Sequence, residues 1–212
     1  MDNQRYKEDL SEIRALMNKS TRFISLSGLS GVLAGMYALV GATLAHFRIR
    51  TFNTVSDNLY DQNEPLFLEQ KLTNDLLLIA AAVVILALLT AILLSAKKAK
   101  ANGENLWNPT SKRLLINFAI PLVSGGLFCL VLLQYGYVAL IASATLIFYG
   151  LACLNASKYT LGDVRYLGIA NIVVGLIATQ FIGYGLFFWG LGFGVFHIFY
   201  GALMFYKYDK TA

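Results

Sequence analysis

Six long apolar stretches alternate with polar joints along the chain. We place them near residues 23–47, 76–96, 114–133, 138–156, 164–182 and 185–206. Each is close to the roughly 20 residues with which an α-helix crosses the hydrocarbon core of a bilayer. The pattern therefore predicts an all-α membrane protein with six transmembrane helices, arranged as three helical hairpins in one bundle over residues 23–206.

The first stretch, Phe23–Phe47, carries no charge and has small residues at helical spacing. Ser27, Gly31 and Gly35 form one stripe, and Ala34, Ala38 and Ala42 form a second. Small residues mark helix contacts in membranes, because lipid gives apolar side chains no reason to leave it. We therefore expect this helix to be central. The residues that we assign to helix packing are Ser27, Gly31, Gly35, Gly190, Gly194 and Gly201.

The hairpins also repeat in sequence. Residues 135–159 resemble residues 184–208, since both begin Tyr-Gly, contain Ile-Phe-Tyr-Gly and end Lys-Tyr. A weaker similarity aligns Thr21-Arg22 and Ala34-Gly35 of the first span with Lys112-Arg113 and Gly125-Gly126 of the third. Both hairpins enter from the same side, so the repeat is parallel, as in some transporter folds.

The basic residues predict the orientation. With six spans, fourteen of the seventeen Lys and Arg residues lie on one side, in the N-terminal segment, the second and fourth joints and the tail. Cytoplasmic loops carry the excess of Lys and Arg. We therefore expect both termini, including the tail 207–212, to be cytoplasmic, and the protein to lie in a bacterial inner membrane. The basic rim also attracts anionic membrane lipid and is not read as a nucleic-acid site.

Residues 1–22 are polar and lack a signal-peptide cleavage pattern. Tyr6, Leu10, Ile13 and Met17 are spaced as one face of an amphipathic helix among charged residues. This cytoplasmic helix either lies on the inner leaflet and covers the bundle or binds a partner. Residues 48–74 are expected to form an outer loop, which either caps the bundle or contacts a ligand.

Composition supports a membrane class, with 57% hydrophobic and 14% charged residues, against about 25% charged in soluble domains. No Asp, Glu, Lys or Arg falls in the middle of a predicted span. Carriers coupled to protons or ions usually keep such residues there, so coupled transport is disfavoured. Cys129 and Cys153 lie at different depths, which argues against a disulfide.

A few uncharged polar residues remain inside the spans. The candidates for lining a ligand site or pore are His197, Asn171, Asn117 and Ser124. They either form interhelical hydrogen bonds or surround a ligand pocket centred on His197, and a catalytic role is the weakest reading. No nucleotide-binding loop, protease motif or catalytic triad is visible, so we expect no enzyme activity and no catalytic residues.

The two histidines do not predict a haem site. His46 lies at the outer end of span one, whereas His197 lies about 18 Å deeper at about 1.5 Å per residue. One iron cannot bind both. His46 with Asp57, Asp61 or Glu64 gives only a weak metal pattern, and we expect no metal and no cofactor.

One resemblance stands out. The run SLSGLSGVLAGMYALVGA, preceded by MNKSTRFI, resembles a family of uncharacterised polytopic membrane proteins of the Bacteroidetes, most strongly over residues 10–45. The family has no established activity. Its genes lie near small winged-helix regulators, so the resemblance implies a signalling or regulatory setting and supplies no functional residues.

The sequence therefore favours a non-enzymatic membrane protein that acts by interaction, as a sensor or scaffold. Its N-terminal helix and span one are the expected surfaces for a protein partner or self-association. The alternative is a passive channel, or a transporter of lipids or small molecules, with a polar interior around His197.

Overall fold

The structure is a computed structural model that describes residues 6, 23, 25–58, 65–103 and 107–209, without the side chains of 56–58 and 65–67. The predicted N-terminal helix and the tip of the outer loop lie outside these residues. The long helices are α2 (Gly28–Asn58), α3 (Pro65–Ala101), α4 (Pro109–Gln134), α5 (Ile141–Ala156) and α6 (Val164–Ala178). A short 3₁₀ turn, η1 (Val138–Leu140), leads into α5. The chain ends in α7 (Gly185–Trp189), η2 (Gly190–Val195), α8 (Phe196–Met204) and η3 (Phe205–Asp209).

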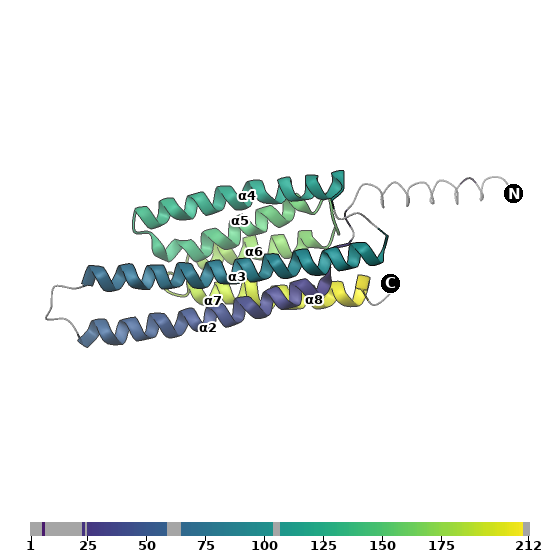
Figure 1. Cartoon of the computed structure of the whole chain (residues 1–212). Coiled ribbons are helices and arrows are strands. Elements are labelled where there is room, and N and C mark those ends of the chain that lie inside the picture. Colours follow the sequence, from purple (N-terminus) through teal and green to yellow (C-terminus); the bar gives the residue numbers. More distant parts are fainter. Residues whose placement is uncertain (1–5, 7–22, 24, 59–64, 104–106, 210–212) are drawn as a thin grey trace.

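The described residues form helices and no strands, which confirms the all-α prediction (Figure 1). Five helical segments are long and apolar enough to cross a membrane: Gly28–Val55, Leu68–Ala101, Pro109–Gln134, Val138–Ala156 and Gly185–Asp209. The apolar helix α6 has only 15 residues, or about 22 Å at about 1.5 Å per residue. The fold is therefore an all-α bundle with five helical segments of the length and hydrophobicity typical of membrane spans and one shorter apolar helix.

The helices differ from the expected spans at two boundaries. The outer loop 48–74 is mostly helical, because α2 continues to Asn58 and α3 begins at Pro65. No Gly or Pro interrupts residues 48–58, and an ion pair of 3.9 Å between Arg48 Nε and Asp75 Oδ2 joins the two helices there. Helix α6 stops at Ala178, not at residue 182, because the chain turns and Gly183 takes a φ of 97°.

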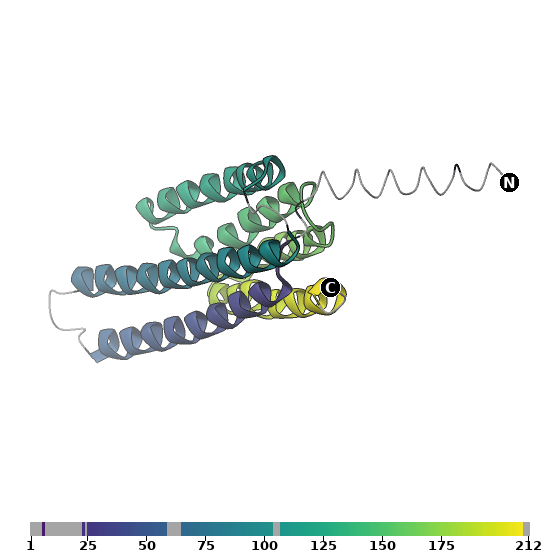
Figure 2. The ribbon, with the colours of Figure 1, turned by 45° about the vertical axis from the view of Figure 1, so that its right-hand side comes forward.

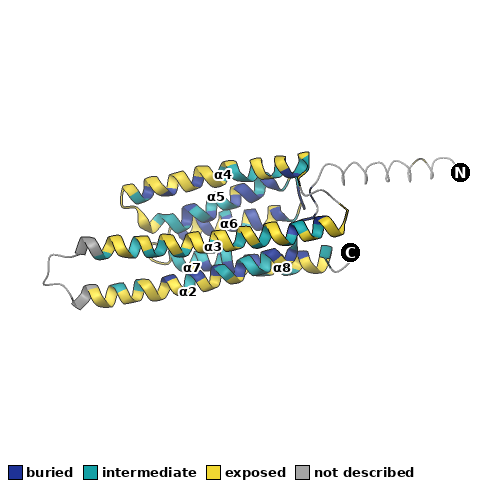
Figure 3. Ribbon diagram, in the orientation of Figure 1, coloured by how far each residue is buried: buried dark blue, intermediate teal, exposed yellow. Residues whose placement is uncertain are grey.

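Helix α2 is the hub of the bundle. It packs on α3, on α8 and on η2, whereas α5 packs on α6 and on α4. Figures 1 and 2 both show α2 and α4 on opposite sides of the bundle, with α2 and α3 extending together beyond the other helices. The buried residues concentrate in α5, α6 and α8, while α3 and α4 are largely exposed (Figure 3).

The last span is not a regular α-helix. Two π-helical stretches, η2 with the sequence GLGFGV and η3 with the sequence FYKYD, interrupt it. π-bulges are rare and occur often at functional sites. The η2 bulge lies directly before His197, so it sets the geometry around the one histidine inside the bundle.

Candidate functional site

His197 is buried in α8, with 7% of its surface exposed, and both of its ring nitrogens are bonded. Nδ1 lies 2.9 Å from the backbone oxygen of Gly192, in the π-bulge. A carbonyl oxygen only accepts, so Nδ1 carries the proton and donates it. Nε2 of the neutral ring then accepts from the Tyr149 hydroxyl at 2.6 Å.

An aromatic cluster surrounds this pair. It consists of Phe118, Tyr149, Trp189, Phe193 and His197. The Tyr149 ring lies 5.0 Å from Phe193 and 5.1 Å from His197, measured between centroids. Phe193 stacks on His197 with an interplanar angle of 24°. The cluster joins α4 and α5 to the last span, and within it the rings of Tyr149 and Phe193 contact the imidazole.

Sequence reasoning did not select Tyr149. It belongs to the first Ile-Phe-Tyr-Gly motif, and its hydroxyl lies within an apolar span. A buried tyrosine hydroxyl usually has a hydrogen-bond partner, although that of Tyr200, in the second motif, has none among the described residues. That tendency was the available signal, but the pairing with a residue 48 positions away depends on the tertiary fold.

Asn171 approaches the same bulge from α6. It is fully buried, and its Nδ2 donates to Leu167 O of its own helix at 2.9 Å. Its Oδ1 has no hydrogen-bond partner. A Cβ added to Gly192 would lie 2.6 Å from this oxygen. The structure thus brings both Asn171 and His197 close to Gly192.

The other two polar candidates lie elsewhere. The backbone oxygen of Asn117 accepts from Asn155 Nδ2 at 2.9 Å, which links α4 to α5. Ser124 is exposed on α4, and its hydroxyl donates to Ile120 O of the same helix. Ser124 therefore does not lie with His197 and Asn171, and the four residues do not line one common site.

The glycine stripes of α2 and the last span face each other. A Cβ on Gly31 would lie 3.1 Å from the Cα of Gly201, and a Cβ on Gly35 would lie 2.6 Å from Gly194 O. One added to Gly190 would lie 3.7 Å from the Cβ of Ala42. The α2 stripe is therefore covered within the chain, which removes this face from the surfaces open to a partner.

A second polar site closes the end of the bundle where Phe23 and Asp209 lie. We call the ion pair and cap around Asp209 the terminal clasp. Asp209 Oδ2 accepts from the backbone nitrogen of Gly28 at 2.9 Å, and Asp209 Oδ1 accepts from Lys98 Nζ at 2.5 Å. Ser27 Oγ lies 3.4 Å from the same carboxylate. The clasp joins the start of α2, the end of α3 and the end of the last span.

Two neighbouring contacts extend this closure to the α5–α6 joint. Thr160 Oγ1 donates to Phe23 O at 2.7 Å, and Lys207 Nζ donates to Asp163 Oδ2 at 2.7 Å. The hydrogen bond from Lys207 is the main cause that lowers the pKa of Asp163 below its ordinary 3.8. Asp163 is therefore ionised at neutral pH. The hydrogen bond from Thr160 to Phe23 O also ties the segment before α2 to the α5–α6 joint.

Among the described residues, no three His, Cys, Asp or Glu side chains gather as a metal site. His46 is exposed near the outer end of α2. Its candidate partners Asp61 and Glu64, and the side chain of Asp57, lie outside what the structure describes. No family model, curated protein or solved structure matches the chain.

Proposed function

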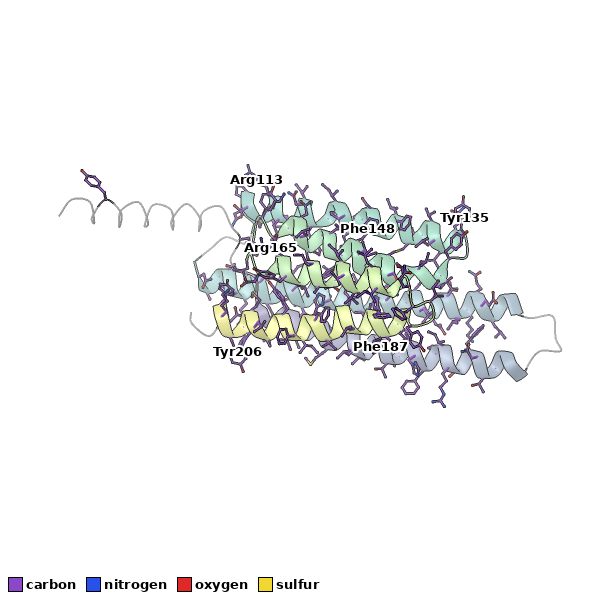
Figure 4. All side chains as sticks on the ribbon, turned by 180° about the vertical axis from the view of Figure 1, so that it is seen from behind. Arg113, Tyr135, Phe148, Arg165, Phe187 and Tyr206 are labelled. Carbon is purple, nitrogen blue, oxygen red and sulfur yellow. The ribbon has the colours of Figure 1, made fainter. Side chains whose placement is uncertain are left out.

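We propose that the protein is a non-enzymatic, multi-pass protein of a bacterial inner membrane that acts by interaction, as a sensor or scaffold. In this proposal α6 completes six spans and both termini are cytoplasmic. Arg113 and Arg165 support this orientation, because they lie with Tyr206 at one end of the bundle, opposite Tyr135 (Figure 4). The resemblance to the Bacteroidetes family agrees with a regulatory setting.

The observation that carries the proposal is the bonding of His197. The imidazole was the strongest candidate for a ligand or a proton, yet Tyr149 and Gly192 occupy both of its nitrogens. A base or ligand-binding group needs a free lone pair or a free donor. The surfaces that remain for function are the amphipathic helix predicted for residues 1–22 and the outer faces of the bundle.

The segment just before α2 is hydrogen-bonded directly to the rest of the bundle. Phe23 donates its backbone N–H to Tyr159 O at 2.8 Å, and Lys98 Nζ donates to Leu26 O at 3.2 Å. A partner bound to residues 1–22 would therefore pull on a segment that contacts α3 and the α5–α6 joint. Coupling through directly bonded segments is the minimum that a sensor or scaffold requires.

Deleting residues 2–20 tests the proposal. Membranes carrying tagged full-length or shortened protein are cross-linked and the protein is purified. We expect a cross-linked partner or N-terminal oligomer with the full chain and its loss with the deletion. Replacing Leu10 and Ile13 by Ser should reproduce the loss, whereas Glu8→Gln, on the polar face, should not.

The alternative function is a passive channel or a transporter of lipids or small molecules. The buried, unpartnered Oδ1 of Asn171 favours it, since an unsatisfied amide oxygen in a membrane interior can receive a polar ligand. Flux through reconstituted protein, without any cross-linked partner of the N-terminal helix, would favour this alternative and overturn the interaction proposal.

A further inference from the structure

Two helix pairs of this bundle cross in the same way. At the α5–α6 crossing, a Cβ on Gly168 would lie 2.7 Å from Gly150 O and 3.0 Å from Leu154 N. At the α8–α2 crossing, a Cβ on Gly28 would lie 2.7 Å from Gly201 O and would collide with Phe205 N. Gly150 and Gly201 occupy the same position of the two Ile-Phe-Tyr-Gly motifs.

The match continues two turns further along the helices. A Cβ on Gly175 of α6 would lie 2.7 Å from Ile147 Cγ1, and one on Gly35 of α2 would lie 2.7 Å from Ile198 Cγ1. Ile147 and Ile198 are again matching residues of the two motifs. The sequence repeat is therefore also a repeat of helix interfaces, with α6 equivalent to α2.

This repeat implies a third interface. Each of the two crossings joins the second helix of one hairpin to the first helix of the next, counting the hairpins cyclically. The remaining pair of this kind is α3 with α4. However, α3 packs on α2, and α4 packs on α5. Among the described residues, α3 and α4 make no extensive contact with each other. Both helices are largely exposed in Figure 3.

Helix α4 has one glycine that corresponds to the glycine face of α2, whereas Ala119 and Leu122 stand at the positions of Gly28 and Gly31. The alignment of spans one and three pairs Gly126 with Gly35. A Cβ on Gly126 would meet nothing within 4 Å. Val123 and Leu130 beside it are both 58% exposed. The neighbouring Gly125, by contrast, packs on Phe148 of α5. We call Leu122, Val123, Gly126 and Leu130 the open α4 face.

The α3 helix of the same chain is held away from this face. Tyr37 and Thr90 share a hydrogen bond of 3.2 Å between their hydroxyls, and Lys98 belongs to the terminal clasp. A second copy of the chain presents the same exposed side of α3 and is subject to no such restraint. In a two-fold dimer, α3 of each copy would pack on the open α4 face of the other copy. Both faces would then be covered, so the assembly would stop at two copies.

We infer that the open α4 face receives α3 of a second copy and so continues the series of interfaces made at α5–α6 and α8–α2. Close approach at glycine is the usual source of affinity between membrane helices. The inference rests on the chain spanning a membrane, as proposed above, but not on the N-terminal helix. Thr90 lies opposite Tyr37, two residues from Gly35, so Leu89 and Ile92 lie at the matching depth.

Disulfide cross-linking in membranes tests the inference. In a background with Cys129→Ala and Cys153→Ala, one tagged copy carries Gly126→Cys. A second copy with a different tag carries Leu89→Cys or Ile92→Cys, both at exposed positions. We expect a cross-link between the two tags. Thr90→Cys, which faces α2 of its own chain, and Val173→Cys, which is exposed on α6, are the matched controls and should remain uncross-linked.

Gly126→Leu provides the second measurement. Because the position is open within one chain, this variant should fold normally and lose the dimer in cross-linking and in size measurements. Absence of the cross-link, a cross-link formed only within one chain that carries both cysteines, or a dimer that survives Gly126→Leu would each overturn the inference. Deleting residues 2–20 should leave this cross-link intact, which separates its failure from failure of the N-terminal proposal.

Discussion

At the scale of single residues, His197 is a structural group whose role depends on Tyr149. The imidazole is buried, and the Tyr149 hydroxyl donates to its Nε2 at 2.6 Å. Hydrogen bonds between membrane helices contribute about 1 kcal/mol. The bond therefore fixes the orientation of α5 against the last span.

Tyr149→Phe should lower the free energy of unfolding by about 1 kcal/mol, because Nε2 is left buried without its donor. Unfolding of the protein in nanodiscs or mild detergent, followed by tryptophan fluorescence, measures the change. Tyr137→Phe, at a tyrosine that is 60% exposed, is the control and should change little. Equal stability of the Tyr149→Phe variant and the unaltered protein would show that the bond contributes nothing.

At the scale of helices, glycines determine how closely the spans approach each other. Gly201 is one of the tight cases, because an added Cβ would collide with the backbone nitrogen of Val32 in α2. The backbone of a neighbouring helix cannot move aside as a flexible side chain can. Position 201, where α8 crosses α2, therefore has no space for any side chain larger than that of glycine. Position 126, on the open α4 face, has space for a larger side chain.

Gly201→Ala should accordingly destabilise the protein by about 2 kcal/mol or more through overpacking. Gly126→Ala should leave stability unchanged or raise it by up to about 1 kcal/mol, because alanine favours the helix. Chemical unfolding of the two variants side by side in the same detergent measures both effects. The reverse ranking would contradict the packing described for α2 and α8.

These packing positions could be read from the sequence, and their polar partners could not. Gly31 and Gly35 follow from helical spacing alone, whereas Ser27 lies before α2 and contacts Asp209. The acceptor at Asp209 lies 181 residues from Gly28, and no local pattern connects the two. The apolar stretch ends near Phe47, whereas α2 continues to Asn58, because loss of hydrophobicity does not by itself end a helix.

At the scale of the whole molecule, ion pairs close one end of the bundle. Lys98 and Asp209 are the more buried pair, with side chains 16% and 12% exposed, and Lys207 and Asp163 are the more exposed pair, at 57% and 27%. Surface pairs of the second kind contribute at most about 1 kcal/mol. The pair at Asp163 nevertheless gives the closure a definite dependence on pH.

The folded-state pKa of Asp163 is lower than its ordinary 3.8. Its contribution to stability is therefore fully present above that value and is lost as the pH falls below 3.8 toward the folded-state pKa. Asp163→Asn should be less stable than the unaltered protein at pH 7, by at most about 1 kcal/mol. The difference should shrink in unfolding measurements at decreasing pH, and a difference that grows would contradict this assignment.

The length of α3 has a mechanical consequence. Its 37 residues span about 55 Å at about 1.5 Å each, against about 30 Å for the hydrocarbon core. No glycine or proline follows Pro65 within it, so nothing provides a hinge. The helix is a lever arm in one piece. Because no hinge lies between its two ends, a sideways force on its protruding end also acts on Lys98 near the other end.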